Sequence, residues 1–430
     1  MTRLRLIGSD TLRSFRTRNF RIYFLGQVIS QAGTWLQLIA QTLLMLRLSG
    51  SATSLGFLAA VQFTPMLLLG PFAGLLADRL DKRRIMFVTQ SLMMVPALLL
   101  GVLTISGQVT TLWVFVLAAV TGTGNAFDNP PRRVILSELV PPEDIANAVS
   151  LNSTMMTLAR VVGPALAALM ITTVGIGWCF IVNALSFVAG IVAVARLDRA
   201  AMSPAMRVPR QSGQVRAGLA YLWAEPDLRR AMIVLAVVST LAFNWPIVLP
   251  LFSADVLSGN ERTYLMLTLV IAAGSLVGAL AVARLRTIHL QTVMRLGLAY
   301  GVAMLAFALV PSTWAAVTVG VVLGGFSISY LSSTASLLQT RAVPEMRGRV
   351  IALHAVVFLG SVPIGGPIAG AVTEWWGPRA GVLAGAIPTI LTAGWAVWAC
   401  RVRRLSPGSE PGSPTTHPGA PTTVQLAPAG

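Results

Sequence analysis

Long runs of uncharged, apolar residues alternate along the chain with short polar segments that are rich in arginine. A helix that crosses the hydrocarbon core of a bilayer needs about 20 predominantly apolar residues. We predict a transmembrane helix for each of twelve such runs: 22–46, 54–77, 85–105, 112–136, 147–173, 178–195, 231–254, 263–283, 293–311, 313–339, 350–373 and 380–400. The pattern therefore predicts an all-α membrane protein with twelve transmembrane helices.

The longest polar gap, residues 197–230, divides the twelve predicted helices into two groups of six. We therefore expect two six-helix bundles, residues 22–196 and 231–400, joined by a cytoplasmic central loop. Residues 1–21 are predicted to form a cytoplasmic N-terminal arm. Residues 401–430 are rich in Pro, Gly, Ser and Thr, which is typical of a disordered tail that has no core to bury.

A helical pattern is present inside the central loop. Val215, Leu219 and Leu222 recur at helical spacing, with Trp223 beside them and Arg216 off that face. This spacing fits a short amphipathic helix on the membrane surface. A partly ordered linker explains the same residues equally well.

Composition agrees with a membrane protein, because apolar residues make up 55% of the chain and charged residues only 11%. Globular proteins usually carry about 25% charged residues, so a soluble enzyme and a disordered chain are both excluded. Cys179 and Cys400 fall at opposite membrane faces in the predicted topology, too far apart for a disulfide. We interpret both cysteines as packing residues, and we expect no metal site.

The net charge of +17 is explained by where the basic residues lie. Cytoplasmic loops of membrane proteins carry an excess of Lys and Arg. With a cytoplasmic N-terminus, the basic residues fall in cytoplasmic segments or at their edges, except for Arg47, Arg160, Arg262 and Arg379. We therefore expect both termini in the cytoplasm, and we expect no nucleic-acid partner.

The loop after the second predicted helix carries an ordered set of residues that begins at Gly74. A glycine that permits close helix approach is followed one turn later by an acid and then by a basic run. A plain basic turn is the alternative, but this order resembles the loop signature of the major facilitator superfamily, with Asp81 where glycine is usual. The resemblance implies that Asp78 braces the outward-facing state against the N-terminal end of the eleventh helix. The residues of this conformational switch would be Gly74, Asp78, Arg79 and Arg83.

The fifth predicted helix contains Gly163-Pro164, and the same pair recurs 203 residues later in the eleventh helix as Gly366-Pro367. This offset is close to half of the chain and indicates an internal duplication. A proline bends a membrane helix and small residues permit close approach, so each could simply be a kinked packing helix. The stretch also resembles the Gly-Pro signature of the antiporter branch of the superfamily, with alanines in place of its final glycines. That resemblance implies a tightly packed gate formed with the symmetry partner of the motif.

Three further stretches, residues 129–133, 217–222 and 344–350, are similar to a group of bacterial exporters within the superfamily. That group includes siderophore exporters and macrolide or multidrug efflux proteins. The resemblance covers roughly residues 15–400. It implies two six-helix bundles that rock around a central site.

Ionisable side chains inside a membrane are costly and are therefore functional candidates. Asp128 lies about eight residues from the cytoplasmic end of the fourth predicted helix, and Arg160 lies near the middle of the fifth. We interpret them either as a structural ion pair or as a proton-coupling pair that lines the cavity. His354, one turn inside the eleventh helix, is best explained as an interfacial histidine.

Several uncharged polar residues lie in otherwise apolar spans and could line a central pocket. Each of them could instead form a hydrogen bond between helices. The first helix carries glutamines and no acid, which argues against cationic drugs as substrates. The candidates for the substrate cavity are Gln27, Gln31, Asn125, Asn152, Asn244 and Tyr330.

The sequence therefore predicts a secondary transporter that exports amphipathic small molecules, with proton antiport as the driving reaction. Export of an endogenous siderophore or secondary metabolite is the alternative within transport, and a lipid scramblase or non-transporting membrane protein is the alternative from another class. No phosphate-binding loop is present in the sequence, which excludes an ATP-driven pump within this chain. We expect a monomer in the inner (plasma) membrane with no cofactor, whose partners are its substrate, protons and the bilayer.

Overall fold

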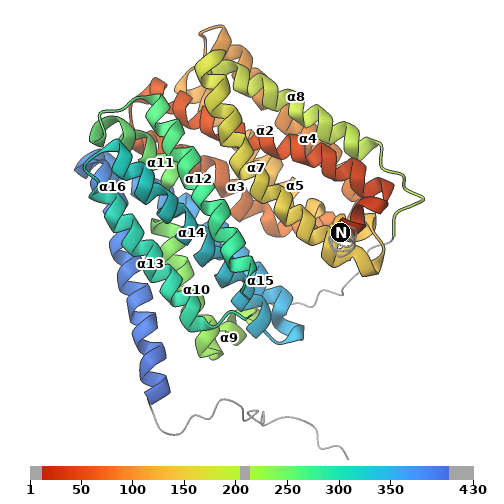
Figure 1. Cartoon of the computed structure of the whole chain (residues 1–430). Helices are drawn as coiled ribbons and strands as arrows, with labels where there is room; N and C mark the ends of the chain where they lie inside the picture. Colours follow the sequence, from red (N-terminus) through yellow and green to blue (C-terminus); the bar gives the residue numbers. More distant parts are fainter. Residues whose placement is uncertain (1–11, 204–213, 286, 406–430) are drawn as a thin grey trace, which may run out of the picture.

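The computed structural model describes residues 12–203, 214–285 and 287–405 of the 430-residue chain. Within these ranges the elements are helices joined by short connections, with no strand (Figure 1). The predicted disordered tail lies outside the described residues, apart from its first five residues, which are helical. Residues 1–11 of the predicted N-terminal arm also lie outside them.

In the described part of the N-terminal half there are six long helices and three short ones. Gly50, with a φ of 62°, ends the first long helix, and the hydroxyl of Ser51 caps the next by accepting a bond from the Ser54 amide at 3.3 Å. The helices are η1 (Arg13–Arg16), α2 (Arg18–Ser49), α3 (Ala52–Arg79), α4 (Lys82–Ile105), α5 (Thr111–Val134), α6 (Leu136–Leu139), η2 (Pro142–Asp144), α7 (Ile145–Thr173) and α8 (Ile176–Ala195).

The C-terminal half begins with a short helix at the position of the predicted amphipathic segment, so the helical alternative for the central loop is confirmed for residues 214–224. The elements of this half are α9 (Gln214–Ala224), α10 (Pro226–Leu241), α11 (Trp245–Leu251), η3 (Phe252–Val256), α12 (Glu261–Ala283), α13 (Leu290–Ala308), α14 (Thr313–Arg341), α15 (Pro344–Gly360) and α16 (Val362–Leu405).

Two of the predicted spans in this half are not continuous helices. The seventh is interrupted at residues 242–244 and continues as α11 and a π-helical turn. The eleventh is interrupted at Ser361, two residues before a proline that cannot donate a backbone hydrogen bond. The remainder of the eleventh span and the twelfth together form α16, which turns at Gly377 with a φ of 85°. A positive φ of this size favours glycine.

Nine helical segments in the described part of the chain are long and apolar enough to cross a membrane. One of the nine, Pro344–Arg401, contains both the eleventh and the twelfth predicted spans. Two predicted spans, the first and the fourth, are not among the nine segments. They lie in α2, which carries four glutamines, and in α5, which ends in charged residues. The all-α membrane fold is therefore confirmed, while the count of twelve crossings stays a prediction.

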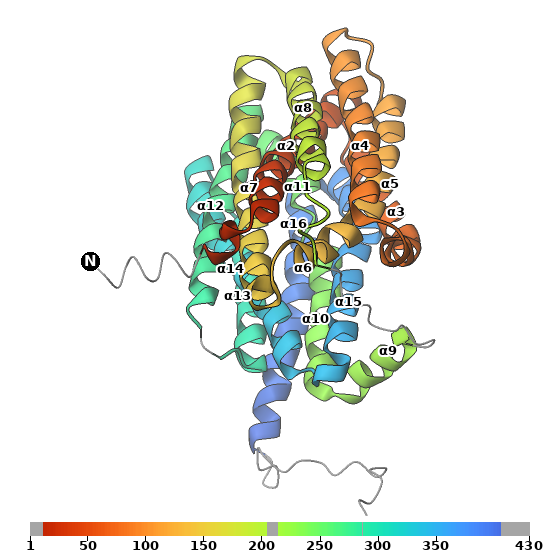
Figure 2. The same cartoon turned by 90° about the vertical axis from the view of Figure 1, so that its right-hand side faces the viewer.

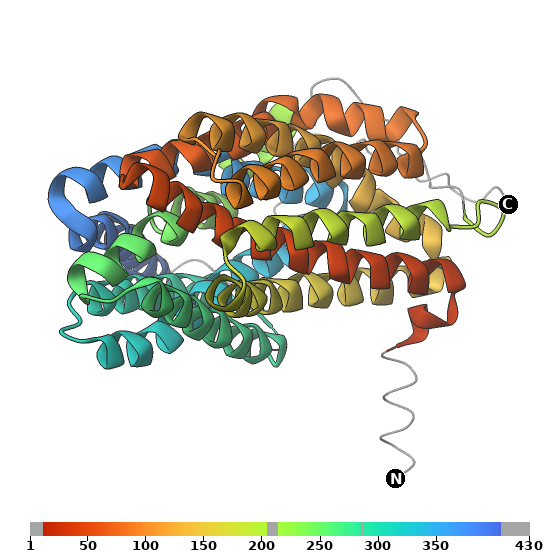
Figure 3. The ribbon, with the colours of Figure 1, turned by 90° about the horizontal axis from the view of Figure 1, so that it is seen from above.

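The helices form two groups that follow the order of the chain. In Figure 1 the red-to-yellow helices α2–α8 lie together, and the green-to-blue helices α10–α16 lie together. The groups meet where α3 packs along α16 and where α7 packs along α12, a contact that is visible from above in Figure 3. The last part of α16 extends beyond its neighbours in Figures 1 and 2.

The two ends of the molecule differ in charge. We call the end at which α2, α4, α7, α10, α13 and α15 begin the arginine-rich end, because it carries most of the basic residues of the sequence. In Figure 1 the two groups of helices diverge toward the arginine-rich end and converge toward the opposite end.

Candidate functional site

At the end opposite the arginine-rich end, the backbones of α3 and α16 touch across the two halves. A Cβ atom added to Gly56 would lie 2.4 Å from the carbonyl oxygen of Gly366. One added to Gly370 would lie 2.6 Å from the carbonyl oxygen of Ala52. Because small residues allow such an approach, the two halves are in direct backbone contact here.

One carboxylate of α16 reinforces this contact. Glu374 accepts hydrogen bonds through Oε2 from the Ala52 amide at 2.6 Å, from the Ser51 hydroxyl at 3.0 Å and from the Thr53 amide at 3.3 Å. These donors belong to the start of α3, where the helix dipole favours a negative charge. Glu374 therefore caps a helix of the other half.

A second polar link joins α2 to α12 at the same end. Arg47 donates two hydrogen bonds to Glu261, at 2.5 and 2.6 Å. The hydrogen bond to Glu261 raises the pKa of Arg47 above its usual value. The Arg47 side chain is 51% exposed, so we expect the pair to contribute less than about 1 kcal/mol. Glu374 is exposed as well, so both links lie at the surface of this end.

At the arginine-rich end, the residues of the loop signature connect elements of the N-terminal half. Arg83 donates to the carbonyl oxygens of Val194 and Ala195, at 3.3 and 3.2 Å, and so ties α4 to the end of α8. Asp81 caps α4 through the Arg83 amide at 2.9 Å and pairs with Arg199. A polar residue at the glycine position of the signature is thus used as a helix cap.

The remaining residues of the loop signature, Gly74, Asp78 and Arg79, lie in the last two turns of α3. The start of α15, which begins the eleventh predicted helix, is bonded to α9 by the Val343 amide and the Tyr221 hydroxyl at 3.3 Å. The bracing role of Asp78 was expected for an outward-facing state, and it stays a prediction.

The two Gly-Pro motifs lie at different helix interfaces. A Cβ atom on Gly163 would lie 2.3 Å from Cβ of Trp35, so Gly163 packs against α2 of its own half. Gly366 packs against Gly56 of α3 in the other half. In this conformation the two motifs therefore do not pack on each other, and the expected gate stays a prediction. At its motif, α7 packs against α2, whereas α16 packs against α3.

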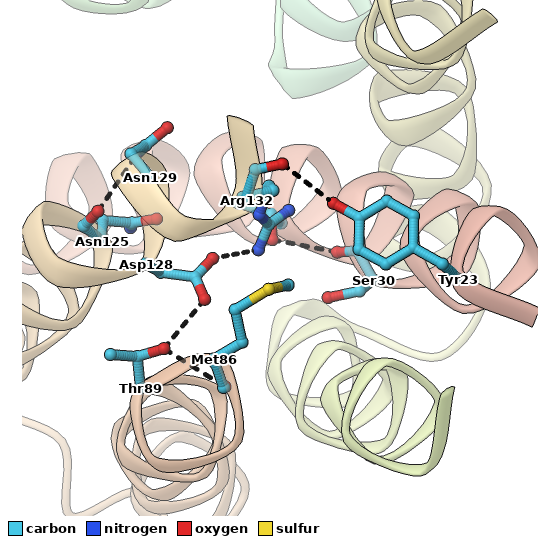
Figure 4. Close-up of polar contacts among 9 residues, drawn as sticks. Tyr23, Ser30, Met86, Thr89, Asn125, Asp128, Asn129 and Arg132 are labelled. Carbon is cyan, nitrogen blue, oxygen red and sulfur yellow. Dashed lines mark hydrogen bonds and ion pairs between the residues drawn. The ribbon is translucent and has the colours of Figure 1, made fainter. Parts of the chain in front are cut away.

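Asp128 lies inside the N-terminal half in a network that Figure 4 shows. Its Oδ1 accepts a hydrogen bond from the Thr89 hydroxyl of α4 at 2.8 Å, and its Oδ2 pairs with Arg132 one turn further along α5. The Tyr23 hydroxyl of α2 donates to the carbonyl oxygen of Arg132 at 3.3 Å. Asp128 and Arg132 are both buried, so the network joins three helices away from water.

The predicted pair of Asp128 with Arg160 is wrong. Asp128 and Arg132 are four residues apart, which places them on the same face of one helix. Arg160 instead lies over the ring of Trp35, with 5.1 Å between the guanidinium carbon and the ring centroid. The residue spacing within α5 was the sequence signal for the correct partner.

The predicted cavity residues are spread over both halves. Gln27 and Gln31 are buried in α2, Tyr330 is buried in α14, and Asn152 lies on α7. The side chains of Gln27, Asn152 and Tyr330 each have a buried polar atom that lacks a hydrogen-bond partner among the described residues. Unsatisfied buried polar atoms are uncommon, so these three residues remain candidates for substrate contacts.

Two other candidates are tied to their own surroundings. The main-chain carbonyl oxygen of Asn125 accepts a bond from the side-chain amide of Asn129 at 2.9 Å (Figure 4). Asn244, at the break between α10 and α11, donates to the carbonyl oxygen of Thr240 at 2.7 Å. Across the described residues, no hydrogen bond joins any two of the six cavity candidates.

A small pocket lies between the two halves where α7 faces α12 and α14. It has a volume of about 100 Å³, and Arg160 is part of its wall. Drug-sized ligands occupy pockets of about 300–1,000 Å³. In this conformation the pocket can therefore hold a small group and not a whole drug-sized molecule.

A comparison with sequence families identifies the family of this protein. A sequence profile of the major facilitator family described as "Transmembrane secretion effector" matches residues 9–426. The chain belongs to the major facilitator superfamily. It is therefore a membrane transporter and not an enzyme.

Two proteins that are similar to this chain over most of its length are efflux proteins. The multidrug efflux pump Tap of Mycolicibacterium fortuitum is 28% identical over 88% of this chain and 95% of its own length. The macrolide efflux protein A of Streptococcus pyogenes is 22% identical over 80% of this chain and 87% of its own. This major facilitator protein is thus similar to efflux pumps over most of its length.

Solved structures agree on the fold. A bacterial homologue of the human lysosomal transporter Spinster, in an inward-facing and unoccupied conformation, superposes with a TM-score of 0.70 over 91% of this chain and 98% of that one, at 16% identity. A nucleoside transporter superposes with a TM-score of 0.65 over 88% and 99%, at 14% identity. At these identities the likeness establishes the fold alone.

Proposed function

We propose that this major facilitator protein exports amphipathic small molecules from the cytoplasm across the inner membrane, in exchange for protons that enter. The names of its relatives support efflux as the direction and drug-like molecules as the cargo. The absence of an acid in α2 favours neutral or anionic molecules over cationic ones.

The observation that carries the proposal is the one-sided contact between the halves. The Gly56–Gly366 contact and the cap that Glu374 provides for α3 close one end. The described polar bonds of Arg83 and Tyr221 at the arginine-rich end stay within one half. Such an arrangement fits a transporter that opens one end at a time by rocking its halves.

The distribution of arginine supports an orientation. Segments rich in Lys and Arg remain in the cytoplasm, so the arginine-rich end would be cytoplasmic and the closed end would face outward. Both termini then lie in the cytoplasm. In this orientation the conformation is ready to receive cargo from inside the cell.

The Asp128 network offers a route for proton coupling. A proton on Asp128 would remove its charge and so weaken the ion pair with Arg132. Arg132 and Thr89 would then lose a partner that joins α5 to α4. Protonation could therefore change the packing of the N-terminal half, and Asp128 with Arg132 replaces Asp128 with Arg160 as the coupling pair that we propose.

Transport by purified protein in liposomes tests this function. A radiolabelled amphipathic drug that carries no ionisable amine, such as chloramphenicol, should concentrate in vesicles whose protein is oriented inside out when the lumen is acidic, and an uncoupler should release it. Vesicles without protein, and vesicles with Asp128→Asn protein, are the controls. Uptake that is the same with and without a proton gradient would refute antiport. Movement of a fluorescent phospholipid without any gradient would favour a scramblase instead.

A further inference from the structure

An arginine at the interface of the two halves carries a charge that no carboxylate among the described residues neutralises. Arg160 lies near the middle of α7 and faces α12 and α14. Arginine stays protonated in proteins, and a charge at this depth in a membrane is costly. No carboxylate among the described residues forms an ion pair with Arg160, and Asp128 is bonded to Arg132 and Thr89 instead.

The contact with Trp35 holds this arginine without using its hydrogen-bond donors. A cation–π contact draws the guanidinium to the aromatic ring through its charge. The Nε atom of Arg160 is buried and has no hydrogen-bond partner in the described part of the chain. Guanidinium N–H groups form a planar fork that matches a carboxylate or phosphate group. The side chain is thus positioned and still has donors to offer an acid.

The pocket beside Arg160 has the chemistry and size of a site for a small acidic group. Leu276 and Ile328 add apolar surface to its wall, and no acidic side chain lines it. The hydroxyls of Thr157, Ser275 and Ser332 also line it, and those of Thr157 and Ser275 donate to main-chain carbonyl oxygens in this conformation. All five come from the middle of α7, α12 and α14, the depth at which transporter sites usually lie. Its volume of about 100 Å³ holds a headgroup, while a larger body must extend beyond it.

We propose that Arg160 and this pocket bind the acidic group of an amphipathic anion that the protein exports. The proposal rests on the function proposed above and names its substrate class. The wall of the site comes from α7 of one half and from α12 and α14 of the other. Rocking of the halves would therefore separate the donors of Arg160 from Ser275 and Ser332, and the acid would be held in one conformation and released in another.

Binding of a matched pair of fluorescent probes tests the proposal independently of transport. The anionic probe is 11-(dansylamino)undecanoic acid, and the neutral probe is its methyl amide. Affinity is measured for full-length protein in phosphatidylcholine nanodiscs. The variants are Arg160→Gln, Arg160→Lys and, as a matched control, Arg295→Gln, which removes an exposed arginine of α13.

Wild-type protein should bind the acid about tenfold more tightly than the amide, which is the scale of a charge-assisted hydrogen bond. Arg160→Gln should lose this preference while its affinity for the amide stays within about twofold, since the amide does not need the charge. Arg160→Lys should keep part of the preference, and Arg295→Gln all of it. Equal binding of acid and amide by the wild type would overturn the proposal even if Arg160→Gln does not fold.

Two further results separate the alternatives. If replacing phosphatidylcholine by phosphatidylglycerol abolishes probe binding only when Arg160 is present, the site belongs to a lipid headgroup and the proposal is overturned. If the acid preference depends on Arg160 but no gradient drives transport, the proposed antiport fails while the anion site stands. If transport is gradient-driven but indifferent to the acid group, the anion site fails alone.

Discussion

The buried pair of Asp128 and Arg132 stabilises the N-terminal half only while both partners remain charged and bonded. Removing one partner of a buried ion pair costs about 3–5 kcal/mol, because the other charge is left unpaired. The Thr89 hydroxyl holds the Asp128 carboxylate, and the Tyr23 hydroxyl bonds to the main chain at Arg132. Such a network is a place where one proton can change the packing of several helices.

We expect Asp128→Asn to abolish gradient-driven export while passive exchange of substrate persists, because the proton site is lost and the pathway is not. The measurement compares net uptake under a pH gradient with counterflow in liposomes. Asp144→Asn is the matched control, since Asp144 pairs with Arg13 outside the helices of the pathway. Asp128→Asn protein that still concentrates substrate, with an unchanged pH dependence, would make Asp128 structural.

At the scale of elements, the close contact of α3 with α16 holds the two halves together at the closed end. The Gly56 position has no room for a Cβ atom in this conformation, whereas a Cβ atom on Gly70 of the same helix would meet nothing within 4 Å. A methyl group at Gly56 should therefore prevent α3 and α16 from closing this end, while α3 itself stays helical.

We expect Gly56→Ala to shift the protein away from the conformation described here and to lower export several-fold, with Gly70→Ala near wild type. Reactivity of a cysteine placed at Thr53 toward an impermeant maleimide, in a background without Cys179 and Cys400, measures the opening. Equal reactivity in the Gly56→Ala and Gly70→Ala backgrounds would show that the close contact does not control this end.

The cap from Glu374 should matter more than the pair of Arg47 with Glu261. An exposed carboxylate at a helix N-terminus contributes about 0.3–1 kcal/mol, enough to shift a balanced equilibrium several-fold. Glu374 accepts hydrogen bonds from three groups at the start of α3, where the cysteine is placed. Glu374→Gln should therefore increase the same cysteine reactivity more than Glu261→Gln. A larger increase in reactivity for Glu261→Gln would show that the pair between α2 and α12 contributes more to closing this end.

These contacts also mark the limit of what the sequence predicts. The helical spans follow from apolar runs, and the Asp128–Arg132 pair could have been found from its four-residue spacing. The bond between Glu374 and Ala52 joins residues 322 positions apart, and no local pattern indicates it. The break at Ser361 and the position of Arg160 over Trp35 likewise depend on how helices pack in three dimensions.

At the scale of the whole molecule, the orientation decides which side the open conformation faces. Cysteines at Ser203 and Ser106, both exposed, lie at the arginine-rich end and at the opposite end. In intact cells without Cys179 and Cys400, an impermeant maleimide should label Ser106→Cys and leave Ser203→Cys unlabelled until the membrane is permeabilised. Labelling of Ser203→Cys in intact cells would invert the topology.

The central claim is that the two halves open one end while they close the other, under the control of a proton. Spin labels at Gln108 and Arg262 report the end that is closed here, and labels at Arg84 and Gln339 report the arginine-rich end; all four residues are exposed. Pulsed electron–electron distances in nanodiscs, measured at pH 8 and at pH 5 in wild type and Asp128→Asn, test the claim most directly. We expect acidification to lengthen the Gln108–Arg262 distance and shorten the Arg84–Gln339 distance in the wild type, with neither change in Asp128→Asn. Distances that stay fixed, or that lengthen together, would contradict the account.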